Sequence, residues 1–121
     1  MHKTILIIED EQTITKALAT ELKESNGFKI ETASDGEQGW QKAKDLKPDL
    51  VILDLILPKL DGFSVLQKIK SDEQTKNIPV VVLTNLSDVN DKVRQLGAQE
   101  CLIKSDYTMN DIKNKIKNQL S

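Results

Sequence analysis

The chain has one cysteine and three prolines among 121 residues, and it has no long hydrophobic run. Cys101 has no partner for an internal disulfide, which indicates a reducing compartment. The apolar runs fall far short of the roughly 20 residues that a membrane-spanning helix requires. The run that follows Met1 is also too short and too β-branched for a signal peptide. We therefore expect a cytoplasmic protein that does not associate with a membrane.

Neither sign of charge dominates, since the formal net charge is −2 and the lysines are scattered. The sequence therefore lacks the basic footprint of a nucleic-acid-binding surface. It also lacks a linker rich in proline, glycine or serine, and it contains no internal repeat. Its length suits one domain, so we expect residues 1–121 to form a single domain without direct nucleic-acid binding.

Four short apolar runs each lead into a residue suited to phosphate or metal chemistry. Continuous β-branched runs of this kind are typical of strands buried on both faces, as in a parallel sheet. A fifth segment, residues 28–33, alternates like a strand. The four runs are Thr4–Ile8 before Glu9 and Asp10, Leu50–Leu53 before Asp54, Val80–Leu83 before Thr84, and Cys101–Ile103 before Lys104.

Helical patterns lie between and after these strands. Gly27 is expected to end the first helix and Pro48 the second, while Ser87 is expected to cap the fourth helix and Gly97 to end it. The expected apolar faces are Ile14, Ala17, Leu18 and Leu22; Trp40, Ala43 and Leu46; Phe63, Leu66 and Ile69; Val89, Val93 and Leu96; and Met109, Ile112, Ile116 and Leu120.

A strand followed by a helix, repeated five times, predicts an α/β fold with helices on both faces of a parallel sheet. Right-handed crossovers restrict the topology. We expect a flavodoxin-like, doubly wound (βα)5 sheet with strand order 2-1-3-4-5, which makes the first and third strands neighbours. Glu9 and Asp10 would then lie beside Asp54 at the carboxyl edge of the sheet, where such folds bind ligands.

The residues at this edge suit a metal-dependent phosphate site. Carboxylates that lie close together repel one another, and a hard divalent cation such as Mg²⁺ relieves that repulsion. Lys104 supplies a positive charge, and the Thr84 hydroxyl can donate a hydrogen bond to a phosphoryl oxygen. An ionised Asp54 can attack phosphorus directly and form an aspartyl phosphate. Each residue alone also fits a helix cap, a turn or a surface position, so the prediction depends on their agreement.

In this order and at this spacing, the residues give a sequence that resembles the receiver domain of two-component response regulators along its whole length. The stretches that carry the resemblance are Glu9-Asp10-Glu11, residues 49–58 around Asp54, Asp61-Gly62, residues 82–84 and residues 102–104.

The resemblance implies that Asp54 accepts a phosphoryl group from a phosphohistidine on a histidine kinase or a phosphotransfer protein. It implies that Asp10, Asp54 and the main-chain carbonyl of Ile56 bind Mg²⁺ (or Mn²⁺), with Glu9 acting through a metal-bound water. Such a domain catalyses its own phosphorylation and dephosphorylation but has no turnover substrate, so it is not expected to be an enzyme.

The resemblance also assigns the switch. Lys104 would pair with Asp54 before the reaction and with the phosphoryl group afterwards, while Thr84 would swing toward that group. The signal would leave through the fourth helix, fifth strand and fifth helix, to an output partner or to a C-terminal output domain that lies outside this sequence. Cys101 stands where relatives often carry an aromatic switch residue, so that rotamer switch is absent.

Other departures concern the surroundings of the acceptor. Ile56 and Asn85 replace residues that are commonly polar and small, respectively, and we expect them to tune phosphoryl lifetime by altering water access. Ser105 replaces a usual proline; a non-proline cis bond costs about 3 kcal/mol, so a trans Lys104–Ser105 bond or a strained exception is expected.

Three other functions compete with the phosphorylated switch. The first alternative is a receiver-like protein-interaction domain that is not phosphorylated. An aspartyl phosphatase would require a second acid at position 56 to protonate the leaving group, and the presence of Ile56 argues against this function. A flavin-binding protein would want a phosphate loop rich in serine, threonine and glycine after the first strand, where Glu9, Asp10 and Glu11 would repel a phosphate. The sequence ends soon after the fifth predicted helix, which fits a stand-alone regulator or an excised domain.

Overall fold

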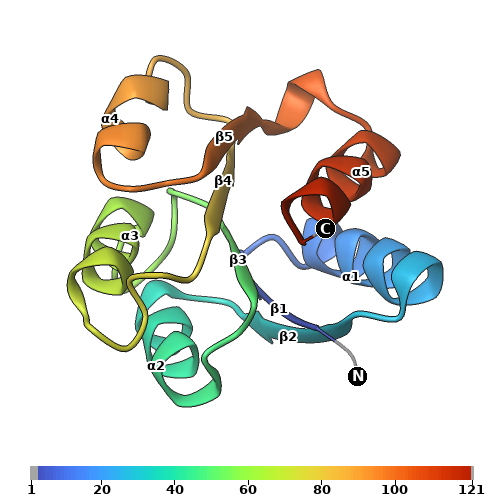
Figure 1. Cartoon of the computed structure of the whole chain (residues 1–121). Coiled ribbons are helices and arrows are strands. Elements are labelled where there is room, and N and C mark those ends of the chain that lie inside the picture. The colour runs from blue at the N-terminus through green and yellow to red at the C-terminus, as the bar shows by residue number, and fades with distance from the viewer. Residues whose placement is uncertain (1–2, 121) are drawn as a thin grey trace.

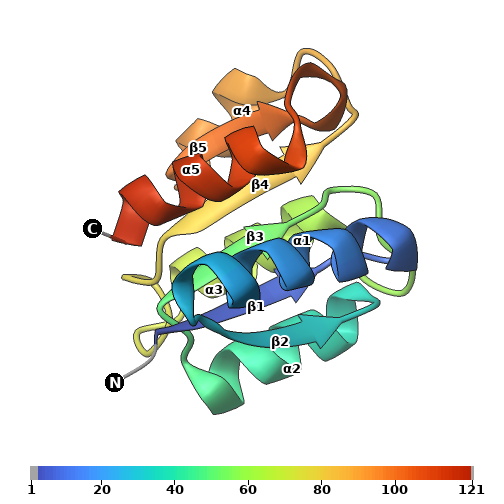
Figure 2. The same ribbon diagram turned by 90° about the vertical axis from the view of Figure 1, so that its right-hand side faces the viewer.

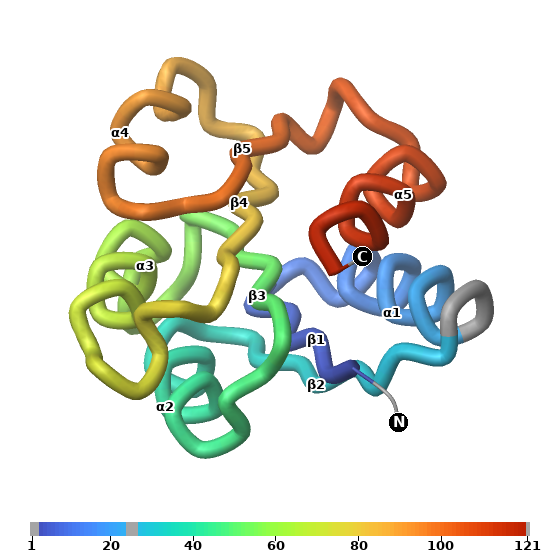
Figure 3. The backbone as a smooth tube through the Cα atoms, viewed as in Figure 1, coloured from blue at the N-terminus to red at the C-terminus, as the bar shows by residue number. Residues whose placement is uncertain are grey.

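Five parallel strands form one sheet in the order β2-β1-β3-β4-β5, as predicted (Figure 1). The structure, a computed structural model, describes residues 3–120, and for residues 24–26 it describes the backbone alone. Figure 3 shows β1 and β3 in the middle of the molecule, between two groups of helices. The strands are β1 (Thr4–Ile8), β2 (Lys29–Ala33), β3 (Leu50–Leu53), β4 (Val80–Thr84) and β5 (Glu100–Ile103).

Helices cover both faces of this sheet. Helices α2, α3 and α4 lie on one face and α1 and α5 on the other, as Figures 1 and 2 show together. None of the described helices combines the length and hydrophobicity needed to cross a bilayer. The helices are α1 (Gln12–Asn26), α2 (Gly36–Leu46), α3 (Gly62–Ser71), α4 (Asn90–Gln95) and α5 (Met109–Leu120), and a short 3₁₀ helix, η1 (Lys104–Asp106), follows β5.

The apolar runs are continuous because successive strand residues enter two different cores. In β1, Ile5 and Ile7 face a core that also contains Leu18, Leu22, Ile112 and Ile116, here called the α1–α5 core. Leu6 and Ile8 face a core that contains Val65, Leu66, Ile69 and Val93, here called the α2–α4 core. The same alternation continues in β3 and β4. The side chain that follows a strand end is therefore expected on the same face of the sheet as the residue two positions before it.

Most of the predicted helix boundaries are confirmed, and one predicted cap is wrong. Gly27 ends α1 with a left-handed φ of 67°, and Gly97 follows α4 with a φ of 105°. Ser87 does not cap α4, because that helix begins after Val89 and its N-cap makes no side-chain hydrogen bond. Strand β4 also includes Thr84, and β5 begins one residue earlier than predicted, at Glu100.

Two residues predicted on apolar helix faces are exposed. Ala17 points to solvent, because the buried face of α1 follows Thr15, Leu18 and Leu22. Leu46 is the last residue of α2, and its side chain is 43% exposed. The spacing of apolar residues therefore predicted the correct helices, but it wrongly placed Ala17 on the buried face of α1 and Leu46 on the buried face of α2.

The start of α3 positions the segment that follows β3. Asp61 is the N-cap of α3 and accepts a hydrogen bond from the Ser64 amide at 2.9 Å. The Gly62 amide donates to the Leu55 carbonyl at 2.9 Å. A Cβ at Gly62 would lie 2.2 Å from the carbonyl oxygen of Asp54, so only glycine allows this close approach. The backbone after β3 is therefore packed directly against a capped helix.

Replacing Asp61 with alanine should lower the free energy of unfolding by about 1 kcal/mol at pH 7, because the N-cap hydrogen bond is lost. The Ser64 amide holds the pKa of the Asp61 carboxyl below its ordinary value. A folded-state pKa below the unfolded value gives stability that is complete above about pH 4 and is lost as pH falls through the folded pKa. Urea unfolding measured from pH 7 downward should therefore show that the difference in free energy of unfolding between Asp61→Ala and wild type becomes smaller in acid.

The matched control is Asp61→Asn, which keeps a side-chain oxygen as the cap acceptor but does not titrate over this range. It should retain most of the stability at pH 7. An Asp61→Ala variant as stable as wild type at pH 7 would contradict the capping role.

Candidate functional site

Three strand ends bring the charged residues of the site together. Glu9 follows β1, Asp54 follows β3 and Lys104 follows β5, and all three side chains are more than nine-tenths buried. Each continues the alternation toward the α1–α5 face, because Ile7, Ile52 and Leu102 all belong to that core. The strand order and the alternation together place these charges at one point.

The Lys104 ammonium lies among three carboxylates. Its Nζ is 2.5 Å from Glu9 Oε1, 3.0 Å from Asp54 Oδ2 and 3.2 Å from Glu11 Oε1. The Lys104–Ser105 peptide bond is trans, which is one of the two geometries expected for a residue that replaces proline. Lys104 is therefore the cation that pairs with this acidic cluster in the structure.

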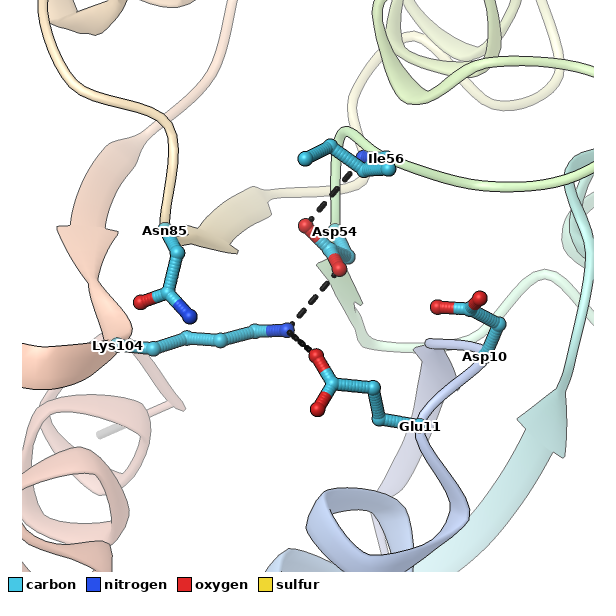
Figure 4. Close-up of a pocket in the computed structure, with 6 residues that line it drawn as sticks. All are labelled: Asp10, Glu11, Asp54, Ile56, Asn85 and Lys104. Atoms are coloured by element: carbon cyan, nitrogen blue, oxygen red, sulfur yellow. Dashed lines mark hydrogen bonds and ion pairs between the residues drawn. The ribbon is translucent and has the colours of Figure 1, made fainter.

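The Asp54 carboxylate is held in one orientation. Its Oδ1 accepts hydrogen bonds from the amides of Leu55 at 2.7 Å and Ile56 at 3.4 Å, while Oδ2 faces Lys104 (Figure 4). These amides belong to the segment packed against α3. One oxygen of Asp54 is therefore bound by main-chain amides and the other by Lys104.

Burial and ion pairing act in opposite directions on these groups. Burial raises the pKa of the Glu9 carboxyl to about 7, although hydrogen bonds involving Lys104 and the Glu11 amide oppose the shift. Burial by itself lowers the pKa of Lys104, but its hydrogen bonds to Glu9 and Asp54 outweigh that effect, and the pKa lies above the ordinary value. Lys104 is therefore a stable ammonium, and the cluster carries more acid than one lysine can balance.

An open cleft of about 190 Å³ gives access to Asp54. In Figure 4 the Asp10 carboxylate turns toward Asp54, and the Asn85 amide lies above the Lys104 side chain. Ile56 also lines this cleft, and the residue is 58% exposed. The residues that line the cleft are Asp10, Glu11, Asp54, Ile56, Asn85 and Lys104.

The donor set suits a hard divalent cation. One carboxylate oxygen from each of Glu9, Glu11 and Asp54 lies within 4.8 Å of the others, and Asp10 adds a carboxylate at the cleft. Mg²⁺ prefers such oxygen ligands. We predicted the cluster as Glu9, Asp10 and Asp54, and the structure adds Glu11. The sequence could have indicated Glu11, because it directly follows the acidic pair Glu9 and Asp10. Its orientation toward Lys104, however, depends on where α1 begins.

Thr84 lies at the predicted strand end but outside the cleft. Its side chain shares the α2–α4 face with Val82, and its hydroxyl accepts a hydrogen bond from the Leu86 amide at 3.2 Å. Asn85 lines the cleft in its place. Cys101 also packs against the α2–α4 core, and burial raises the pKa of its thiol. The two predicted switch positions thus lie on the same face of the sheet, opposite the charged cluster.

Replacing Lys104 with methionine should lower the free energy of unfolding by about 3 kcal/mol at pH 7, because Glu9 and Asp54 would remain buried without a cation. Urea unfolding without divalent metal measures this cost. The matched control is Lys68→Met on the exposed face of α3, which should change stability by less than about 0.5 kcal/mol. Equal stability of the two variants would show that Lys104 does not balance the cluster.

Comparison with known proteins begins with the sequence. Residues 5–117 match the family model described as the response regulator receiver domain. The DNA-binding dual master transcriptional regulator RpaA of Synechocystis is 43% identical over 102 residues, which cover 83% of this chain and 42% of RpaA. The chain spans less than half the length of the curated relatives it matches.

Solved structures give the same result. The phosphorylated cyanobacterial phytochrome response regulator RcpA is 30% identical with a TM-score of 0.82, covering 98% of this chain and 91% of RcpA. The receiver domain of the Pseudomonas aeruginosa sensor histidine kinase PA1611, solved with a magnesium ion in its active-site cleft, is 25% identical with a TM-score of 0.83, covering 99% of this chain and 98% of that domain. With the strand order and the charged cleft already in place, these matches show that the chain belongs to the receiver-domain family of response regulators, which are signalling proteins.

Proposed function

We propose that residues 1–121 form a single receiver domain that works as a phosphorylation-driven switch, with Asp54 as the phosphoryl acceptor. The observation that carries the proposal is the geometry of Asp54. Its carboxylate lies at a strand end in an open cleft, with one oxygen bound by two main-chain amides and the other paired with Lys104. This arrangement supports a nucleophile that is held in a fixed orientation beside a cation.

The proposed step is a transfer from a phosphohistidine of a histidine kinase or phosphotransfer protein. An Asp54 oxygen forms a bond to phosphorus while the phosphorus–nitrogen bond of the donor breaks, and the electron pair of that bond stays on the imidazole nitrogen. An ionised aspartate needs no general base to attack phosphorus. Lys104 offsets the charge on the phosphoryl oxygens, since catalysis of phosphoryl transfer is mostly positioning and charge stabilisation.

Asp10, Asp54 and the main-chain carbonyl of Ile56 are the proposed ligands of Mg²⁺ (or Mn²⁺), with Glu9 acting through water. When bound, the ion would supply positive charge to the phosphoryl oxygens. The acidic donor set supports this assignment. The magnesium ion described for the PA1611 receiver supports it as well.

The proposed output is a change in partner binding at the α4-β5-α5 surface. Phosphorylation would draw the Thr84 hydroxyl away from the Leu86 amide and toward the phosphoryl group, and Cys101 lies beside this path on the same core. The effector would be a partner protein or an output domain outside this sequence. The longer relatives, which include transcriptional regulators, support the second option. Every residue expected at the acceptor site is present, so the alternative of a receiver-like interaction domain that is not phosphorylated has no comparable support.

Asp54→Asn should abolish phosphoryl incorporation, because an amide oxygen is a poor nucleophile. Intact mass after incubation with Mg²⁺ and a small phosphodonor measures incorporation. Asp45→Asn, an exposed carboxylate of α2, is the control and should be phosphorylated like wild type. Chelation of Mg²⁺ should also suppress the gain in mass. Full incorporation in Asp54→Asn would contradict the assignment.

Ile56→Asn should shorten phosphoryl lifetime by about threefold or more, since a polar side chain at the cleft can hold a water near phosphorus. Asn85→Ala should also shorten it, because a smaller residue opens the approach. Loss of phosphate after removal of the donor measures both. Leu46→Asn, an exposed apolar position at the end of α2, is the control. Unchanged lifetimes in both cleft variants would rule out the tuning role.

A further inference from the structure

The segment between β3 and α3 carries the main-chain carbonyl of Ile56, one of the ligands of Mg²⁺ under the proposed function, on which this inference rests. Ile56 is exposed at the cleft. A main-chain ligand is held in place only if the backbone on both sides of it is fixed. Before Ile56, the Leu55 carbonyl accepts a hydrogen bond from the Gly62 amide at 2.9 Å, which ties the segment to α3. The second support has to lie after Ile56.

That second support is a strained turn that contacts the start of α2. Lys59 has a left-handed φ of 70°, and the Leu60 amide donates to the Pro58 carbonyl at 2.8 Å. These are the features of a γ-turn of the strained, positive-φ kind, here called the Lys59 turn. The Pro58 carbonyl also accepts from the amide of Gly36, the first residue of α2, at 3.2 Å. Backbone strain persists only where the surrounding structure holds it, and α2 provides that hold.

The contact between α2 and the Lys59 turn depends on a missing side chain. A Cβ at Gly36 would overlap the carbonyl oxygen of Leu60, so only glycine allows the turn to lie this close. Lys59 Nζ also lies 3.7 Å from Oδ2 of Asp35, the N-cap of α2. The Lys59 side chain is 62% exposed, and an ion pair in water contributes little. The backbone contact at Gly36 therefore supports the turn more than the ion pair does.

We propose that Gly36 and the Lys59 turn are positioning elements for the metal site, because they fix the carbonyl of Ile56 from its far side. Mg²⁺ requires nearly octahedral oxygen geometry, so a displaced carbonyl weakens binding. The Asp54 carboxylate is oriented separately, by the Leu55 amide on the α3 side of the segment. Loosening the turn should therefore weaken Mg²⁺ binding and leave the phosphoryl acceptor in place.

The first test is Gly36→Ala, whose methyl group would push the Lys59 turn away from α2. Calorimetric titration with Mg²⁺, without a phosphodonor, should show affinity about tenfold weaker than wild type, as is typical when the support of a metal ligand is lost. The matched control is Gly39→Ala, also in α2, where the added Cβ would meet the Ile8 side chain at 2.7 Å and not the turn. Its Mg²⁺ affinity should stay within about twofold of wild type, although both variants crowd a buried position.

A second pair of variants tests the turn without crowding α2. Lys59→Pro forces φ to about −65° and breaks the turn, whereas Lys59→Gly, the conservative variant for the backbone, accepts a positive φ without strain. Both remove the ion pair with Asp35. Lys59→Pro should bind Mg²⁺ about tenfold more weakly than wild type, and Lys59→Gly should stay within about threefold.

Phosphorylation by acetyl phosphate gives an independent readout. In Gly36→Ala the Mg²⁺ concentration for half-maximal rate should rise about tenfold, while the rate at saturating Mg²⁺ should stay within about twofold of wild type. A general loss of structure would lower the saturated rate as well, and circular dichroism checks that each variant is folded.

Wild-type Mg²⁺ affinity in both Gly36→Ala and Lys59→Pro would overturn this proposal alone. An equal loss of affinity in Gly39→Ala would also overturn it, because the cause would then be general destabilisation of α2. Absence of Mg²⁺ binding in wild type would overturn the proposed metal site, and this proposal with it. Mg²⁺ titrations that follow the expected pattern, with no phosphoryl incorporation in wild type, would support this proposal and contradict the phosphorylation switch.

Discussion

The pairing of one lysine with a group of carboxylates, which meet only when β1, β3 and β5 lie in one sheet, is the interaction on which the site depends. Lys104 is separated from Asp54 by 50 residues and from Glu11 by 93. Like charges this close repel one another, and a cation among them relieves that repulsion. The fold therefore holds the Asp54 carboxylate in one orientation and in contact with a positive group.

Strand alternation refines this arrangement. Glu9, Asp54 and Lys104 inherit the α1–α5 face from the strand residues two positions before them, and Thr84 inherits the opposite face from Val82. The charged cluster and the Thr84 hydroxyl therefore lie on opposite faces of the sheet. Under the proposed function, a signal that begins at Asp54 would have to pass from the α1–α5 face to the opposite face before it reaches α4.

The sheet order, the approximate position of every strand and α-helix, and the main charged residues were predictable from the sequence, because they follow from apolar runs and from residues at strand ends. The short helix η1 was not predicted. The orientation of individual side chains was less accessible. Glu11 joins the cluster only because α1 starts at Gln12 and turns its side chain inward. The Ser87 cap is wrong because α4 begins only after Val89, and Asp88 between them has a left-handed φ of 59°.

The division of the interior into two cores has a consequence for how such a chain diversifies. Residues of the α1–α5 core and the α2–α4 core meet through the sheet backbone rather than through one shared layer of side chains. Substitutions in distant, separately packed groups tend to be additive in their effect on stability. One helical layer can therefore accumulate changes that alter what it recognises, while the opposite layer and the strand tips between them keep their packing.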